Sequence, residues 1–380
     1  MTSPEIIDPR TFPDPADAPL ESARLHALAA ASQTALSRES ETLDREIVAT
    51  LSALLSPGEG ERLATVFATA PSVAIHRHLW RLLVQCERGM AADGALRVTV
   101  FALPLVIVAG IEGNDRSRET LTCVLENSDA LADILREHGV LSGNRSFALA
   151  RALAAVHAID LARLPDLLAW QALPDVPTFA RIVEPAPIEL VTGPETVHLR
   201  FLLGGALAAA GAELLRDTEV GKWGIPFTQA LGRALDVPGV SVLALPRAPQ
   251  SLLQAAQSGR TAQREVGAHI FASNAIRKLR ASVGEPTAVI SAHRVDGAPG
   301  GGELRLSLSS PFGPRDAEGF RCPLFPLDRV GDVVAMLVDL MGECRVADVR
   351  IVPGVHGDRH PATGLPLLFK GDDVPSVVTH

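Results

Sequence analysis

Two histidines and an aspartate lie close together near the C-terminus, in the string HGDRH at 356–360. Imidazole nitrogens and carboxylates are ligands that bind zinc or iron in proteins. A metal site also needs ligands that converge with a defined geometry and outer partners that orient them. A hairpin loop between strand 347–353 and a last strand near 365–369 explains the string equally well, since no HExxH-like helix orients the two imidazoles. The candidate metal ligands are His356, Asp358 and His360.

Four acids form a second candidate group, because the string Arg-Asp-x-Glu occurs twice, at 216–219 and at 315–318. Paired carboxylates at equivalent loops could bind a hard cation or perform acid–base chemistry. We favour the alternative, in which solvated loop acids near helix starts are stabilised by the helix dipole. Burial or a perturbed pKa is what marks a functional acid, and the sequence shows neither. The candidate loop acids are Asp217, Glu219, Asp316 and Glu318.

Other motifs of catalysis or cofactor binding are missing from the sequence. The glycines at 300–302 lead into a strand, whereas glycines that bind phosphate open onto a helix N-terminus. No GxSxG elbow occurs, and no cysteine has a matching histidine pattern. The sequence therefore assigns no catalytic residue and predicts no cofactor, with a divalent metal as the alternative.

Basic residues are concentrated in the stretch 260–280, which could bind phosphate groups of a nucleic acid. However, the formal net charge is −9 and the pI is near 5.7, so the protein as a whole repels phosphates. Tyrosine is absent, and the predicted central strands carry Val, Leu and Ile instead of the aromatic residues on which RNA bases stack. A nucleic-acid partner is therefore disfavoured, and we expect the basic residues to pair with Asp and Glu. These residues are Arg260, Arg264, Arg277, Lys278 and Arg280.

Composition indicates a soluble cytoplasmic protein with more than one core. The chain has 380 residues, of which 47% are hydrophobic, and single cores stop growing near ~250–300 residues. Three of the 35 basic residues are lysines, a bias that indicates a GC-rich bacterial genome. The four scattered cysteines form no CxxC pair, which fits a reducing cytoplasm. The N-terminus lacks a secretory pattern, and apolar runs such as 98–111 are shorter than the ~18–20 residues that span a bilayer.

In the first third of the chain, the hydrophobic pattern changes at Gly94 from one typical of helices to one typical of strands. Residues 1–20 are acidic and rich in proline, which predicts a flexible arm. Apolar residues at three-to-four-residue spacing predict a helical region over 21–93. An apolar run over 96–108 predicts a central strand, with a bulge or break at Pro104, and a mostly helical insertion is expected over 117–172.

An internal duplication is the main architectural signal. Segments 197–246 and 304–353 each contain an alternating strand, an RDxE string, a helix and a strand that ends in proline. Each copy also has a preceding strand, at 188–192 or 288–295, which is expected to form a hairpin with the alternating strand. With strand 240–246 shared by both copies, each reads as a βαββαβ unit of the ferredoxin-like type.

These observations predict an α+β protein with two tandem ferredoxin-like βαββαβ repeats, or alternatively one mixed sheet, after a helical N-terminal region. The first repeat spans 94–246 and the second 240–380. The preferred function is a non-catalytic scaffold or regulator that binds a protein partner, a copy of itself or a small ligand, since open sheet edges commonly pair with another subunit. One alternative is a metal-dependent hydrolase or transferase that uses the HGDRH loop. The other is nucleic-acid binding through the 260–280 helix.

Overall fold

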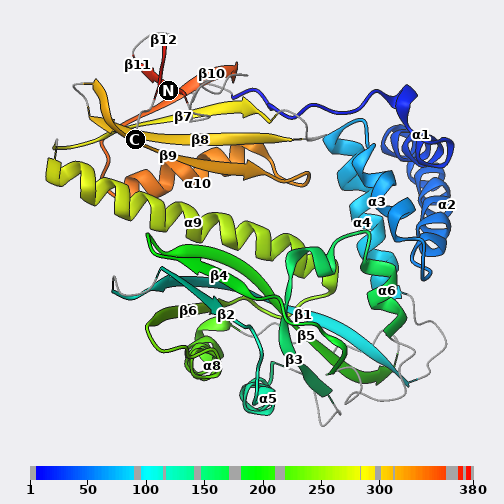
Figure 1. Ribbon diagram of the computed structural model, residues 1–380. Helices are drawn as coiled ribbons and strands as arrows, with labels where there is room; N and C mark the ends of the chain where they lie inside the picture. The colour runs from blue at the N-terminus through cyan, green and yellow to red at the C-terminus, as the bar shows by residue number, and fades with distance from the viewer. Residues whose placement is uncertain are drawn as a thin grey trace. The chain divides into compact units, whose positions relative to one another are not determined.

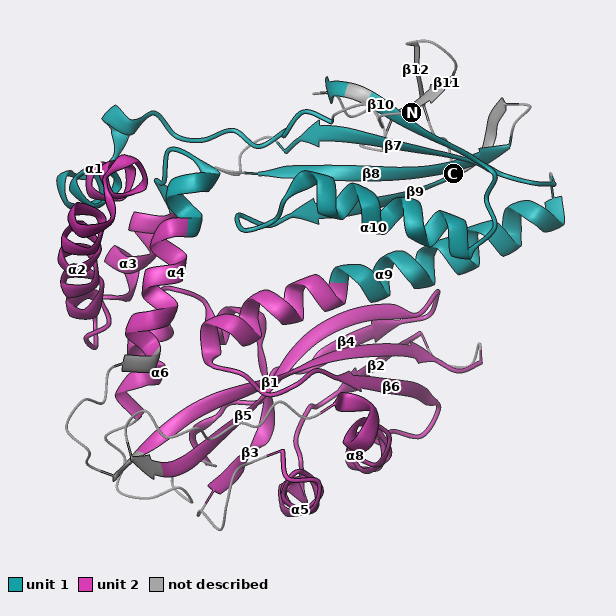
Figure 2. Cartoon of the chain, turned by 180° about the vertical axis from the view of Figure 1, so that it is seen from behind, with its two compact units in different colours: residues 1–26, 68–77, 264–380 teal, residues 27–67, 78–263 magenta. Residues whose placement is uncertain are grey.

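The computed structural model describes residues 6–89, 96–113, 117–140, 147–170, 181–209, 219–282, 284–295, 301–310, 313–356, 367–370 and 374–377 (Figure 1). It is a mixed α+β structure, which confirms the predicted class. The chain divides into two compact units, each assembled from discontinuous segments (Figure 2). Unit 1 contains Met1–His26, Ala68–Arg77 and Arg264–His380, and unit 2 contains Ala27–Phe67 and His78–Gln263.

Helices occupy the N-terminal region, as the periodicity predicts. In the second of them, Ile47, Leu51 and Leu54 are buried, so one apolar stripe faces inward. The helices are α1 (Leu20–Thr34), α2 (Ser37–Leu54), α3 (Gly60–Ala68) and α4 (Val73–Gly89), preceded by a 3-10 turn, η1 (Pro15–Asp17). Within the residues that the structure describes, no helix combines the length and the apolar character needed to cross a bilayer.

Unit 2 is built on an antiparallel sheet with the strand order β3-β5-β1-β6. Its strands are β1 (Leu96–Ile111), β3 (Phe147–Ala155), β5 (Thr196–Ala209) and β6 (Val240–Pro246). The apolar residues of β1 are buried from Val98 to Ala109, as expected for a strand covered on both faces.

Pro104 does not break β1, because its missing N–H falls where no ladder bond is required. The pairing of β1 with β5 runs through Pro104 without a register shift. On the opposite side, the Ala102 N–H donates to the Gln250 carbonyl at 2.9 Å, and the Pro104 carbonyl accepts from the Arg247 N–H at 2.9 Å. Backbone N–H groups along a strand point alternately to its two sides, so the nitrogen of Pro104 points to the same side as the N–H of Ala102. On that side the pairing of β1 with β6 ends at Leu105, so the missing N–H of Pro104 interrupts no pairing.

Helices cover both faces of the unit 2 sheet (Figure 1). On one face lie α5 (Ser128–Glu137) and α8 (Val220–Ala234), and on the other lies the first part of α9 (Leu252–Ser282). Gly259 lets α9 approach closely, because a Cβ there would lie 2.9 Å from Leu199 and 3.1 Å from Pro104. The remaining elements of unit 2 are β2 (Arg118–Leu121), η2 (Val156–Ile159), α6 (Leu164–Ala169) and β4 (Ile188–Val191).

Two predictions about this unit are wrong. The insertion 117–172 was expected to be mostly helical, but it contains β2 and β3. The sequence of β3, FALARALAA, consists largely of helix formers, and its pairing with β5 overrides that propensity. The predicted hairpin of 188–192 with the following strand does not form, since β4 pairs with β2. Helix α8 begins at Val220 and contains Pro226.

Unit 1 contains the second sheet, with the order β10-β7-β8-β9. Its strands are β7 (Thr287–Arg294), β8 (Gly302–Ser310), β9 (Gly313–Leu324) and β10 (Asp348–His356). Strands β7, β8 and β9 form an antiparallel meander that contains the predicted second hairpin, and α10 (Val330–Glu343) then leads to β10, which is parallel to β7. Two short strands, β11 (Leu367–Lys370) and β12 (Val374–Val377), form a separate hairpin.

The apolar core of unit 1 lies between this sheet and two helices. Ala288, Ile290, Leu304 and Leu306 of the sheet share one buried cluster with residues of α10 and the second part of α9. Figure 1 shows both helices on the same side of the sheet.

The tandem ferredoxin-like arrangement is not confirmed. Strand β6 pairs with β1 and does not enter the second sheet, which is completed by β9. The two RDxE strings also differ in structure: the one at 315–318 lies inside β9, whereas Glu219 directly precedes α8. The same four-residue pattern therefore occurs in two different local structures, because long-range contacts, such as the pairing of β9 with β8, override the local sequence.

Candidate interaction site

The predicted metal ligands fall largely outside the described residues. His356 is the last residue of β10, and Asp358 and His360 lie beyond the described part. Among the residues that are described, no group of three His, Cys, Asp or Glu side chains is arranged to hold a metal ion. The metal site at HGDRH therefore stays a prediction.

The described loop acids make local contacts within their own units. Asp217 lies outside the described residues, and Asp316 lies in β9. Glu219 is exposed at the start of α8 and forms an ion pair with Lys222 at 3.4 Å, within unit 2. Glu318 is half-buried in β9 and forms an ion pair with Lys278 of α9, within unit 1. Glu219 therefore lies beside a helix start, whereas Glu318 lies in a strand and not in the loop that the sequence predicts.

The basic residues of α9 pair with acids and carbonyls. Arg280 binds Glu285 at 2.9 Å and the Cys344 carbonyl at 3.1 Å, and Arg277 binds Asn274 at 2.8 Å. Burial lowers the pKa of the Arg260 guanidinium, and the charge of Asp160 opposes that effect.

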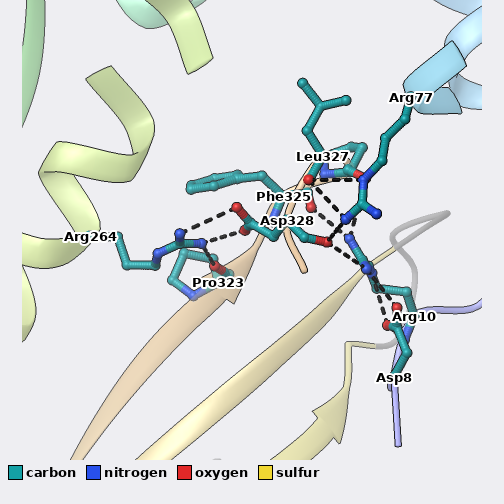
Figure 3. A network of polar contacts seen from close by, with 9 residues as sticks. Asp8, Arg10, Arg77, Arg264, Pro323, Phe325, Leu327 and Asp328 are labelled. Atoms are coloured by element: carbon teal, nitrogen blue, oxygen red, sulfur yellow. Dashed lines mark hydrogen bonds and ion pairs between the residues drawn. The ribbon is translucent and has the colours of Figure 1, made fainter. Parts of the chain in front are cut away.

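Arg264 is the most deeply placed of these basic residues and holds the loop between β9 and α10 (Figure 3). Its guanidinium forms an ion pair with Asp328, and the two side chains are 5% and 12% exposed. The same guanidinium donates to the Pro323 carbonyl at 3.0 Å and lies over the Phe325 ring, 5.2 Å from its centroid. The Asp328 carboxylate also accepts from the Phe325 N–H at 2.7 Å. Asp328 is thus bound both to α9 and to its own loop.

The carbonyls of this loop, residues 325–328, accept hydrogen bonds from two further arginines. Arg10 donates to the Phe325 carbonyl at 2.7 Å and to the Asp328 carbonyl at 3.0 Å. Arg77 of α4 donates to the Leu327 carbonyl at 3.1 Å and to the Asp328 carbonyl at 2.6 Å. Figure 3 shows the two guanidinium groups converging on these oxygens. Charge-assisted bonds of this kind are stronger than neutral ones, so three arginines fix one short loop.

Arg10 itself is fixed by Asp8. The Asp8 carboxylate accepts from Arg10 Nε at 2.8 Å and from Nη2 at 2.5 Å. Burial acts to raise the pKa of Asp8, but the hydrogen bonds from Arg10 outweigh it and hold that pKa below its usual 3.8. The sequence predicts a flexible arm over 1–20, whereas Pro9 and Arg10 are buried here. This part of the segment is held against unit 1.

The sheet face opposite α9 and α10 carries polar residues that are nevertheless buried. Ser291 Oγ lies 2.7 Å from His293 Nε2 on β7, and Arg305 Nε donates to Glu303 Oε1 at 2.7 Å on β8. Serine, histidine and a carboxylate are the residue types of nucleophilic catalysis. However, Ser291 is 1% and His293 0% exposed, so a substrate has no access to this pair, and the cluster serves as an internal polar network.

Strand β10 forms one edge of the unit 1 sheet, and β9 forms the other. Within the described residues, β10 pairs with β7 alone. Val349, Ile351 and Val352 are half-buried there, while the side chains of Asp348 and Arg350 are exposed and form an ion pair at 2.9 Å. A register shift follows Val352, so the regular edge comprises residues 348–352. The sequence reveals β10 as a strand, but only the sheet order shows that it is an edge.

Comparisons of the chain with protein-family models, with curated proteins and with solved structures give no match. The candidate interaction site therefore rests on geometry alone.

Proposed function

We propose that the protein acts without catalysis, by binding another protein chain at the edge strand β10 of unit 1. The observation that carries the proposal is the position of β10 at the end of the sheet. An edge strand presents unpaired N–H and C=O groups on its outer side, and these can add a strand from another chain. The half-buried Val349 and Ile351 add apolar surface to this backbone edge.

The loop that precedes α10 and β10 is held by hydrogen bonds and an ion pair. Helix α10 leads directly into β10, and the loop before α10 is the one that Arg10, Arg77 and Arg264 hold. A preorganised edge loses less conformational entropy on binding than a mobile one. The polar network thus serves the proposed interaction by fixing the elements that precede β10.

A cytoplasmic location belongs to the same proposal. Cys86, Cys123, Cys322 and Cys344 are all free in the structure, as expected in a reducing compartment.

Size-exclusion chromatography with light scattering, combined with pull-down from a lysate, tests the proposed function. We expect a molar mass above the 40.1 kDa of one chain, or a retained partner whose binding is lost when β10 is altered. A strict monomer that retains no partner would refute the proposal.

A further inference from the structure

We infer that the partner of β10 is β10 of a second copy, paired antiparallel about a twofold axis at Val349. This inference rests on the proposed function and identifies the protein chain that binds β10. The two four-stranded sheets would then join through their β10 edges into one continuous sheet. Such an interface is isologous, because the same surface is used by both copies.

The charges of β10 select this arrangement. In antiparallel pairing centred on Val349, Asp348 lies opposite Arg350 of the second copy, and Arg350 lies opposite Asp348 of the second copy. A register centred on Arg350 instead places the two Arg350 side chains opposite each other, and one centred on Asp348 does the same for the two aspartates. Opposite charges across strands stabilise pairing and like charges oppose it. One of these three registers is therefore favoured.

Parallel pairing in register lacks this complementarity. It would place each charged residue beside its own equivalent, so that like charges neighbour each other along the edge. The opposite charges of Asp348 and Arg350, two residues apart on one face of the strand, are thus self-complementary in antiparallel order. In the single chain they form an exposed ion pair with each other. Pairing exchanges the two intrachain ion pairs, one in each copy, for two equivalent ion pairs between the copies.

The apolar side of β10 adds to the same arrangement. Val349 packs against the core cluster of unit 1 while remaining half-exposed. Val349 pairs with Ala288 of β7, which is fully buried in that cluster. At the twofold axis the two Val349 side chains would meet and extend the core from one copy into the other. The exposed remainder of Val349 and Ile351 would then be removed from water.

A charge-exchange series on the full-length protein, followed by light scattering over a range of concentrations, tests the pairing. We expect the wild-type protein to reach twice the 40.1 kDa of one chain. Asp348→Arg and Arg350→Asp should each weaken dimerisation by tenfold or more, because each places like charges opposite one another. The double variant D348R/R350D restores both pairs and should restore the dimer. Circular dichroism establishes that each variant is folded.

The control is Asp339→Arg, which reverses an exposed charge on α10 and should leave the dimer unchanged. The inference is overturned if Asp348→Arg has no more effect than Asp339→Arg, or if the folded double variant stays monomeric. A wild-type monomer whose capture of another protein is lost with Asp348→Arg also overturns it, while leaving the proposed function intact. A monomer that captures nothing overturns both.

A cysteine at the axis gives an independent readout of the register. Residues opposite each other in an antiparallel pair have Cα atoms about 4.5–5.5 Å apart, within reach of a disulfide. Val349→Cys should therefore cross-link two copies on mild oxidation and run as a dimer on a non-reducing gel. Ala347→Cys should not, because Ala347 lies opposite Ile351 of the second copy. Equal cross-linking of the two variants would overturn the proposed register.

Discussion

Removing the carboxylate of Asp328 tests whether the buried ion pair with Arg264 stabilises unit 1. In Asp328→Ala, the Arg264 guanidinium stays buried without its charge partner, and the Phe325 N–H loses its acceptor. Truncating one partner of a buried pair costs about 3–5 kcal/mol, and leaving a buried N–H without an acceptor costs about 1–3 kcal/mol more. These contributions overlap and Asp328 is 12% exposed, so we expect a loss of about 3–4 kcal/mol in the free energy of unfolding.

The assay must report on unit 1. Trp80, Trp170 and Trp223 all belong to unit 2, so tryptophan fluorescence follows that unit. Urea unfolding monitored by circular dichroism covers both units, and the difference between the two signals isolates unit 1. The expected result is an earlier transition in circular dichroism with little change in fluorescence.

Two comparison variants make this prediction falsifiable. Glu285→Ala removes the exposed partner of the Arg280–Glu285 ion pair in unit 1 and should cost about 0–1 kcal/mol. Replacing both buried partners, with Arg264→Met and Asp328→Leu together, should cost much less than Asp328→Ala alone, since no buried charge is left unpaired. If Asp328→Ala costs no more than Glu285→Ala, the Arg264–Asp328 ion pair does not stabilise unit 1.

Four further predictions follow from particular contacts. Gly204→Ala should destabilise unit 2 by about 1–3 kcal/mol or more in urea unfolding, because its Cβ would lie 2.1 Å from the Phe101 ring, whereas Gly331→Ala meets nothing within 4 Å. Burial acts to raise the pKa of Asp44, but hydrogen bonds from Ser32 and His78 outweigh it and lower that pKa below 3.8. Asp44 therefore stabilises the fold above about pH 3.8, an effect lost as the pH falls through the lowered pKa, and Asp44→Asn should show a weaker acid dependence of the melting temperature. Burial raises the pKa of Cys322 to about 12, so a thiol reagent at pH 8 should modify the more exposed Cys344 before Cys322 in the native protein. If the HGDRH string binds a divalent metal, elemental analysis should find one ion per chain that is lost in the double variant His356→Ala with His360→Ala.

The sequence predicts those elements whose side-chain pattern agrees with their final environment. The helices before Gly94, strand β6 and the order α9, β7, β8, α10, β10 all follow from periodicity. Strand β3 does not, because its alanines and leucines favour a helix and its pairing with β5 is a long-range contact. Strand β9 is missed for a related reason: Gly, Pro and Glu are poor strand formers, and β8 pairs with such residues of β9 regardless.

The candidate site was predictable only in part. The sequence indicates that the basic residues of α9 pair with acids, and Arg264, Lys278 and Arg280 do so. It gives no sign that Arg10 binds carbonyls 315 residues further along the chain. A carbonyl acceptor is present at every residue, so no spacing of side chains marks the loop at 325–328 as the target. The one available signal was an arginine within an acidic, proline-rich segment.

The arginine-bound loop and the edge strand are linked through α10. That helix starts two residues after Asp328 and ends five residues before β10, so the position of its first turn depends on the loop. A loosened loop would let the start of α10 move against the sheet. Strand β10 would then be less well ordered for pairing with a second copy. Asp328→Ala should therefore weaken self-association as well as stability, even though Asp328 does not lie on β10. If Asp328→Ala lowers the stability of unit 1 while the dimer dissociates at an unchanged concentration, the edge is organised by β7 alone and the loop has no part in the interaction.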